Sequence, residues 1–230
     1  MTMKIQDEFI DSIKKSNASE LSGEIVEFSV DQLLDEGLLK DIPWVGWIFK
    51  AKNIYTTISD QLFFAKIMSF LISIDETSEE EKLNFSKKVE NDLKFKNKVG
   101  STLLLALEKI NDIEKPQLLA KVFTSFLKNY IDFNEFHLLT DSINTAFIDD
   151  LRKLARLGTK EGRYDRLDYE RLYRSNLSEI QKNISFETQT GGSSINIDFK
   201  LSKVGERLKD ILQDRIKQRA EQIERNKELW

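Results

Sequence analysis

The 230-residue sequence contains no cysteine, only two prolines and nine glycines, and a single histidine. Without cysteine, the chain can form no disulfide and offers no thiolate as a nucleophile or metal ligand. This composition suits a reducing cytoplasm, and the charged amino terminus lacks the apolar run of a signal peptide. The scarcity of proline and glycine leaves long segments rich in Leu, Ile, Lys and Glu, which sustain helices at little cost. The sequence therefore predicts a mainly α-helical, cytoplasmic protein.

Residues that could carry catalysis are equally scarce. The only histidine, His137, lies on a predicted helix between apolar residues and has no metal-ligand partner nearby in the sequence. The motifs that mark phosphate-binding loops, zinc proteases and serine hydrolases are also missing. We therefore expect no catalytic residue, no metal, no cofactor and no enzymatic activity.

Charge is distributed unevenly along the chain. Residues 151–230 contain 18 Lys and Arg against 13 Asp and Glu, a balance of +5, so the total of −4 leaves −9 for residues 1–150. This asymmetry indicates two modules, which either match each other's charge or give the second module an anionic partner. The domains expected are amphipathic helices at 1–41, a helical bundle at 42–148 and a small module at 149–230.

The most apolar stretch, residues 42–74, contains two of the three tryptophans. A bilayer-spanning helix needs about 20 mostly apolar residues with few charges. Charged residues interrupt this stretch at Lys50, Lys52, Asp60 and Lys66. It is therefore a poor transmembrane segment, and we interpret residues 60–74 as the central helix of the bundle. The side chains expected to meet the surrounding helices are Leu62, Phe63, Ile67, Phe70 and Ile74.

The front of this stretch, residues 43–55, has two interpretations. It either belongs to the bundle or is exposed and contacts a membrane surface or a protein partner. In a bilayer interface, Trp rings lie at the headgroup level and lysines extend toward water. The candidate membrane- or partner-binding residues are Trp44, Trp47, Phe49, Lys50 and Lys52. In the membrane version the protein is peripheral at the inner face of the cell membrane.

Capping signals divide the rest of the first two thirds into short helices. Ser78 precedes three glutamates, Pro116 follows Lys115 at a helix start, Asp132 stands three residues before a glutamate, and Gly158 provides a left-handed stop. The short turns between such helices predict a compact bundle. The helices expected cover residues 4–15, 30–39, 60–74, 79–93, 95–110, 115–127, 136–147, 149–158 and 167–180.

Alternating apolar residues at 184–201 predict a β-hairpin. A two-residue turn on Gly192 and Ser193 would pair Phe186 with Phe199, which places the apolar residues of both strands on one face. The same register pairs Ile184 with Leu201. A final helix is expected from Ser202 to about Glu228, either as a single protruding helix or as a coiled-coil seam that forms a homo-oligomer.

In that register Glu187 lies opposite Asp198, and Lys200, two residues further along the strand of Asp198, is diagonal to Glu187. An acid facing an Asp-x-Lys segment resembles the metal-binding core of restriction-like nucleases, in which two carboxylates hold Mg²⁺. The flanking helix and central sheet of that fold are missing from this sequence. We therefore interpret the three residues as a solvated face of the hairpin.

The segment Leu201-Ser202-Lys203-Val204-Gly205, which follows the second strand, resembles the L-[ST]-x-x-G exit from the wing of bacterial winged-helix domains. This resemblance covers residues 149–212 and implies a winged-helix-like α+β module. In such regulators the helix before the wing reads DNA. The corresponding nucleic-acid-binding candidates are Arg166, Arg171, Arg174, Lys182 and Lys200.

The overall order of segments, an apolar aromatic stretch, a helical bundle and a winged-helix-like unit, resembles bacterial Abi-alpha (abortive infection) proteins. The likeness rests on residues 118–127, 154–158 and 201–205, and it implies antiviral defence by membrane disturbance or partner binding. The fold expected is mainly α, a bundle followed by a small module with one β-hairpin and a long C-terminal helix. The function expected is that of a non-enzymatic phage-defence or toxin-type effector acting by membrane association or protein–protein interaction. The alternative is a winged-helix nucleic-acid-binding transcriptional regulator.

Overall fold

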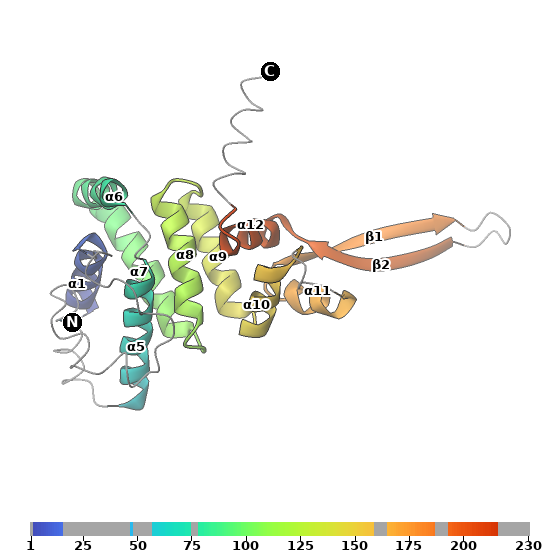
Figure 1. Cartoon of the computed structure of the whole chain (residues 1–230), viewed down its shortest axis with the longest axis horizontal. Coiled ribbons are helices and arrows are strands. Elements are labelled where there is room, and N and C mark those ends of the chain that lie inside the picture. The colour runs from blue at the N-terminus through green and yellow to red at the C-terminus, as the bar shows by residue number, and fades with distance from the viewer. Residues whose placement is uncertain are drawn as a thin grey trace, which may run out of the picture. The chain divides into compact units, whose positions relative to one another are not determined.

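The computed structural model describes residues 2–15, 47, 57–74, 78–158, 165–186 and 193–215. These residues form helices and one two-stranded antiparallel sheet (Figure 1), so the predicted mainly α fold with a single β-hairpin is confirmed for this part of the chain. The chain divides into two compact units, residues 1–132 and 133–230. The division thus falls one helix earlier than the expected boundary at 148.

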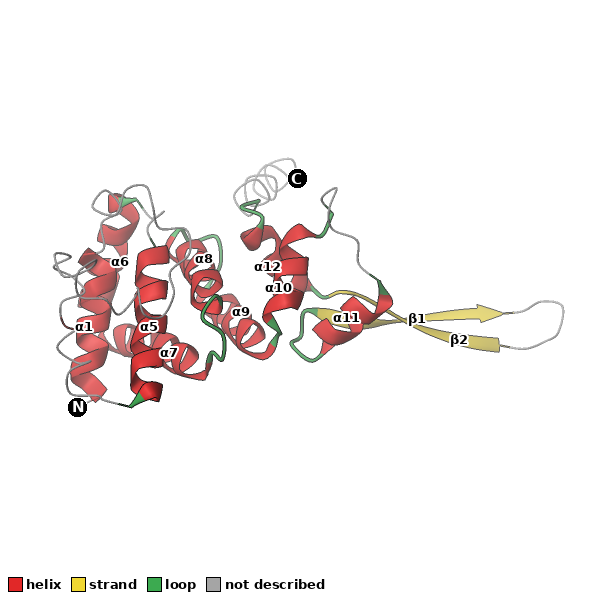
Figure 2. Ribbon diagram, turned by 60° about the horizontal axis from the view of Figure 1, so that its bottom comes forward, coloured by secondary structure: helices red, strands yellow, loops and turns green. Residues whose placement is uncertain are grey.

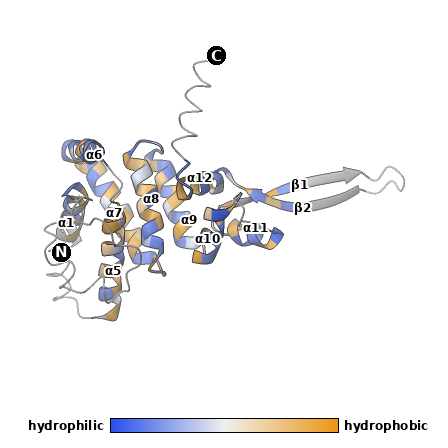
Figure 3. Ribbon diagram, in the orientation of Figure 1, coloured by the Kyte–Doolittle hydropathy of each residue, from blue (hydrophilic) through white to orange (hydrophobic). Residues whose placement is uncertain are grey.

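The first unit is a bundle built around one central helix. Its elements are α1 (Thr2–Lys15), α5 (Ile58–Ser73), α6 (Glu79–Asn91), α7 (Leu93–Lys109) and α8 (Lys115–Leu127). Helix α5 contacts both α7 and α8, and α1 contacts α6 and α7. Figure 3 shows α5 as a predominantly apolar ribbon. A helix that is apolar on nearly every side needs neighbours all round, and α5 has them.

The core of the first unit is aromatic. The Phe70 ring of α5 lies 5.7 Å from the ring of Phe9 on α1 and 5.7 Å from the ring of Phe123 on α8. Of the residues predicted to line this core, Ile67, Phe70 and Ile74 are fully buried. Leu62 is 40% exposed, so its predicted core position is wrong: it lies one turn into α5, before the run of buried residues begins at Phe64.

Local capping explains where several helices start and stop. The Ser78 hydroxyl accepts a hydrogen bond from the Glu81 N–H, while the Glu81 carboxylate accepts one from the Ser78 N–H at 2.8 Å, so the predicted capping box is confirmed. Pro116 lies in the first turn of α8, where its missing N–H has no cost. Gly158 adopts φ +82°, which confirms the predicted left-handed stop after α10 (Ile148–Arg156).

The second unit packs short helices around the base of the hairpin. Besides α10, it contains α9 (Phe133–Thr145), α11 (Arg166–Tyr173), β1 (Ser178–Phe186), β2 (Ser193–Leu201) and α12 (Lys203–Leu212). Helix α10 contacts α11 and α12, α9 contacts α12, and α11 contacts both strands. Figure 2 shows the two strands extending as a ribbon well beyond α11 and α12.

Two predicted helix ends in this unit are wrong. The helix expected to reach Ile180 ends at Tyr173, and Asn176, at φ +59°, turns the chain into β1. Asparagine tolerates this left-handed conformation better than most residues. The final helix ends at Leu212, not at Glu228, and Asp214 adopts φ +55° just after it. The expected coiled-coil seam beyond residue 215 lies outside the described residues.

The predicted hairpin register is also wrong. Six residues separate the strands instead of two, and the structure pairs Phe186 with Ser193, Ile184 with Ile195 and Ser178 with Leu201. The offset from the predicted register is an even number of residues. Because side chains alternate with period two, an even offset leaves Phe199 on the face that the alternation predicts.

Candidate partner-binding surface

The hairpin is fixed to the second unit at its base. The Ser202 N–H donates to the Leu177 carbonyl at 3.1 Å, and the Ser202 hydroxyl accepts from the Gly205 N–H at 3.0 Å as the cap of α12. The Leu177 side chain is fully buried, and the Ser178 hydroxyl donates to the Tyr169 carbonyl of α11. The Leu-Ser-x-x-Gly segment that stood out in the sequence therefore joins β2, α12 and the start of β1.

One face of the ribbon carries exposed apolar side chains, and the register also places Lys182 on this face, opposite Ile197. Ile180 lies directly opposite Phe199, and Ile197 is two residues before Phe199, so the three side chains share a face. The Phe199 ring packs against the ring of Tyr173 on α11, with centroids 5.8 Å apart and planes at 66°. Tyr173, Ile180 and Ile197 are 48, 41 and 47% exposed. We call this surface, Tyr173, Ile180, Ile197 and Phe199, the ribbon face.

The opposite side of the ribbon is polar. Glu179 lies opposite Lys200, and their charged atoms form an ion pair at 3.2 Å. Gln181 lies opposite Asp198. A two-stranded ribbon of this kind is only marginally stable by itself in water, so its apolar face gains stability from packing against a further layer.

Asp198 also protects the outer edge of β2. Its carboxylate accepts a hydrogen bond at 2.8 Å from the N–H of the next residue, Phe199. An exposed strand edge invites pairing by another strand, and a charged side chain that occupies an edge N–H opposes this. Near Phe199, therefore, a partner is better accommodated on the ribbon face than as an added strand along the edge of β2.

An ionic cluster joins α10 to α11 beside the ribbon. Arg171 donates to Asp150 at 2.9 Å and to Asp168 at 2.5 Å, and Lys153 donates to Asp168 at 2.7 Å. The side chains of Asp150 and Asp168 are only 6 and 5% exposed. Buried carboxylates need such partners, because an unpaired buried charge is costly.

This cluster bears on the nucleic-acid-binding candidates. Arg171 is engaged by two buried carboxylates and Lys200 by Glu179. Arg166, at the start of α11, and Arg174, just after its end, are exposed. The side chain of Lys182 lies outside the described residues. Phosphate-dominated binding needs clustered cations. Two of the five predicted residues, Arg171 and Lys200, are thus paired with carboxylates of the protein itself.

The membrane- or partner-binding candidates of residues 44–52 are described only at Trp47. Its indole N–H donates to the Ser12 hydroxyl of α1 at 2.6 Å, and its ring meets the Phe64 ring of α5 edge-on, with centroids 6.4 Å apart. Trp47 is thus half-buried against the first unit itself. Trp44, Phe49, Lys50 and Lys52 lie outside the described residues. No helix among the described residues is long and apolar enough to cross a membrane.

The nuclease-like arrangement does not form in the observed register. Asp198 faces Gln181 and Lys200 faces Glu179, while Glu187 lies outside the described residues. Groups of three or more His, Asp or Glu side chains that could hold a metal ion are also lacking from the ranges that the structure covers. His137 is exposed on α9 and lies 3.5 Å from Asp141, one turn further along the same helix.

Sequence reasoning singled out neither Tyr173, which lies in a helix as predicted, nor Ile180, which was assigned to the same helix but lies in β1. For Ile180 the apolar alternation is interrupted by Lys182, so the available signal was Asn176, a residue type that favours a break in the chain before the strand. Comparisons of the chain with protein-family models, curated proteins and solved structures return no match. Fold and surface therefore define a general class only, a mainly helical protein whose second unit presents an amphipathic β-hairpin.

Proposed function

We propose that the protein is a non-enzymatic binding protein that docks onto a partner protein through the ribbon face, as an effector in bacterial phage defence. The observation that carries this proposal is the exposure of Tyr173, Ile180 and Ile197 on one continuous surface. The defence setting is the part that rests on the resemblance of the sequence to Abi-alpha proteins.

A protein partner suits this surface better than a phosphate backbone does. Aromatic residues are enriched at protein interfaces. The ring pair of Tyr173 and Phe199 gives the ribbon face this character, and Lys182 is the one charged residue that the observed register places on the same side of the strands. The charges of Glu179 and Lys200 neutralise each other on the opposite side. Trp47, the described member of the membrane-contact candidates, is held by Ser12 and Phe64. The protein-binding version of the expected function therefore has more support than the membrane version.

The test begins with crosslinking in cells that express the protein. A photoreactive phenylalanine at Tyr173 should crosslink to a partner, whereas the same residue at Glu170, which is exposed on α11 but outside the ribbon face, should not. The crosslinked partner is identified by mass spectrometry and purified. Its affinity is then measured for two variants, Ile180→Asp and Gln181→Asp.

These two variants form a matched pair. Each adds one carboxylate to β1, and the two positions are adjacent in the sequence but lie on opposite faces of the strand. Ile180→Asp should weaken binding at least about tenfold, which corresponds to about 1.4 kcal/mol, and should abolish protection against phage in a plaque assay. Gln181→Asp faces Asp198, which costs at most about 1 kcal/mol of strand pairing, and it should leave binding within about twofold of native and protection intact. Equal crosslinking from positions 173 and 170, or full binding by Ile180→Asp, would refute the proposal.

A further inference from the structure

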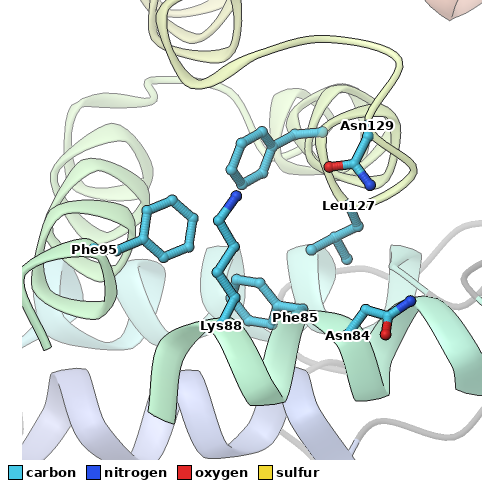
Figure 4. Close-up of a pocket in the computed structure, with 7 residues that line it drawn as sticks. Asn84, Phe85, Lys88, Phe95, Leu127 and Asn129 are labelled. Atoms are coloured by element: carbon cyan, nitrogen blue, oxygen red, sulfur yellow. The ribbon is translucent and has the colours of Figure 1, made fainter. Parts of the chain in front are cut away.

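A small pocket lies in the first unit where α6, α7 and α8 meet (Figure 4). Its floor is apolar and buried, formed by Phe85, Phe126 and Leu127, which are 5, 7 and 7% exposed. Its rim is polar and exposed, with Asn84 on α6 and Asn129 just after α8 on one side. The cavity volume is about 100 Å³. Pockets for cofactors and drug-sized ligands measure roughly 300 to 1,000 Å³, so this one has room for a single side chain or chain end.

Lys88 forms the other side of the rim. Its ammonium nitrogen lies 4.5 Å from the centre of the Phe95 ring and 5.9 Å from the centre of the Phe126 ring (Figure 4). A cation is attracted to the face of an aromatic ring at these distances, so the two rings hold the ammonium at the mouth of the pocket. No carboxylate of the described residues lies within ion-pair distance of Lys88. Among the described residues, the contacts that balance its charge are therefore those with the two rings.

Three lysines and two acids fall between residues 87 and 94. Lys87 and Lys94 are exposed near Lys88 in the sequence, at the end of α6 and the start of α7. The two acids between these lysines are engaged elsewhere. Glu90 pairs with Lys14 of α1 at 2.8 Å, and the Asp92 carboxylate accepts the N–H of Phe95 at 2.9 Å as the cap of α7. The mouth of the pocket is thus complementary to a negative charge.

We infer that this pocket binds the carboxyl terminus of a peptide that ends in an apolar side chain. The apolar side chain would fill the floor over Phe85 and Leu127, and the terminal carboxylate would accept hydrogen bonds from the ammonium of Lys88 and from the side-chain amides at the rim. Charge-assisted hydrogen bonds of this kind are about twice as strong as neutral ones. The rings already hold an ammonium, which argues against a cationic ligand and for an anionic one. This site is independent of the ribbon face and goes beyond the proposed function.

The experiment uses the full chain and two probes that differ only in charge, N-acetyl-leucine and its amide. In nitrogen-15 NMR titrations, the acid should shift the backbone signals of Phe85, Lys88 and Asn129, and it should bind at least tenfold more tightly than the amide. Acetate and inorganic phosphate should bind at least tenfold more weakly than N-acetyl-leucine, since neither fills the apolar floor.

The matched variants are Lys88→Met and Lys87→Met. Lys88→Met keeps the length of the side chain but removes its charge, so the acid and the amide should then bind equally weakly. Lys87→Met removes a neighbouring exposed lysine that does not line the pocket, and it should retain at least half of the preference for the acid. Both lysines are exposed, so both variants should fold. Absence of shifts at the pocket, equal binding of acid and amide to the native chain, or tight binding of phosphate alone would each overturn the inference.

Discussion

Gly205 lies at the closest approach between α12 and the segment that leads into β1. A Cβ atom at this position would lie 1.9 Å from the carbonyl oxygen of Leu177, which also accepts the N–H of Ser202. Gly205→Ala should therefore lower the free energy of unfolding of the second unit by at least about 3 kcal/mol, because a fixed backbone atom must move. Urea denaturation followed by circular dichroism measures this. Gly158→Ala is the control, since a Cβ there meets nothing within 4 Å and the positive φ costs only about 1 to 2 kcal/mol. Equal losses in the two variants would contradict the packing argument.

The stability that the ionic cluster gives to the fold depends on pH through the carboxyl group of Asp168. Burial alone would raise the pKa of its carboxyl group, but the hydrogen bond from Lys153, the backbone N–H of Asp165 and the charges of Lys153 and Arg171 hold that pKa below its ordinary value. A carboxylate with a lowered pKa in the folded state stabilises the fold above its unfolded pKa of about 3.9. That contribution is lost as the pH falls through the lower, folded pKa.

Asp168→Asn should therefore destabilise the protein most at pH 7, because the native carboxylate is then ionised and paired. The difference in free energy of unfolding between the native protein and the variant should shrink toward zero between pH 4 and pH 2. Urea denaturation at a series of pH values tests this. Asp149→Asn serves as a comparison, because the Asp149 side chain is 80% exposed and should matter little at any pH. A constant difference for Asp168→Asn across the range would show that the ionic cluster does not carry the effect.

Among the elements, the helices could be predicted where their signals are local. Ser78 and Glu81 exchange hydrogen bonds that cap the start of α6. Pro116 lies in the first turn of α8, where a backbone N–H has no partner within the helix. Gly158 adopts the positive φ that ends α10. Each signal depends only on residues within one turn of the helix. Their positions could therefore be deduced from the sequence without any knowledge of tertiary contacts.

The register of the hairpin could not be deduced in this way, because it is set at the base of the ribbon. Local turn chemistry at Gly192 favoured a two-residue turn. The structure instead fixes Ser178 to Tyr169 of α11 and Ser202 to Leu177, which aligns Ser178 with Leu201. These contacts form only when α11 and α12 are in place. The alternation of apolar residues was predictable, but the pairing depended on tertiary packing.

The absence of cysteine allows a direct test of this register. In a chain carrying Gln181→Cys and Asp198→Cys, the two thiols lie on directly opposite residues and should form an intramolecular disulfide on mild oxidation. Opposite residues of antiparallel strands have Cα atoms about 4.5 to 5.5 Å apart, within the range that a disulfide spans. Glu187→Cys with Asp198→Cys, the pair that the two-residue turn would have favoured, should stay largely reduced. Mobility on non-reducing gels and peptide mass spectrometry distinguish the outcomes, and preferential oxidation of the second pair would refute the observed register.

For the molecule as a whole, the sequence could predict candidate residues but not their exposure. Arg171 looked available for phosphate, yet it meets Asp150, 21 residues away in the chain. Trp47 looked available for a membrane, yet its ring meets Phe64 and its N–H meets Ser12. Composition and spacing report what a side chain can do, whereas contacts between distant segments decide whether it is left available to do so.

The division into two units predicts that each unit depends on its own core. Phe70 is fully buried against Phe9 and Phe123 within the first unit, and Leu208 of α12 is fully buried within the second. Phe70→Ala should destabilise the first unit by about 3 to 5 kcal/mol, and Leu208→Ala should destabilise the second by about 2 to 5 kcal/mol. Hydrogen exchange followed by mass spectrometry should show faster exchange in α5 and α8 for the first variant, and in α10 and α12 for the second. If either variant accelerates exchange equally in both units, the chain unfolds as one cooperative body and the division does not describe its energetics.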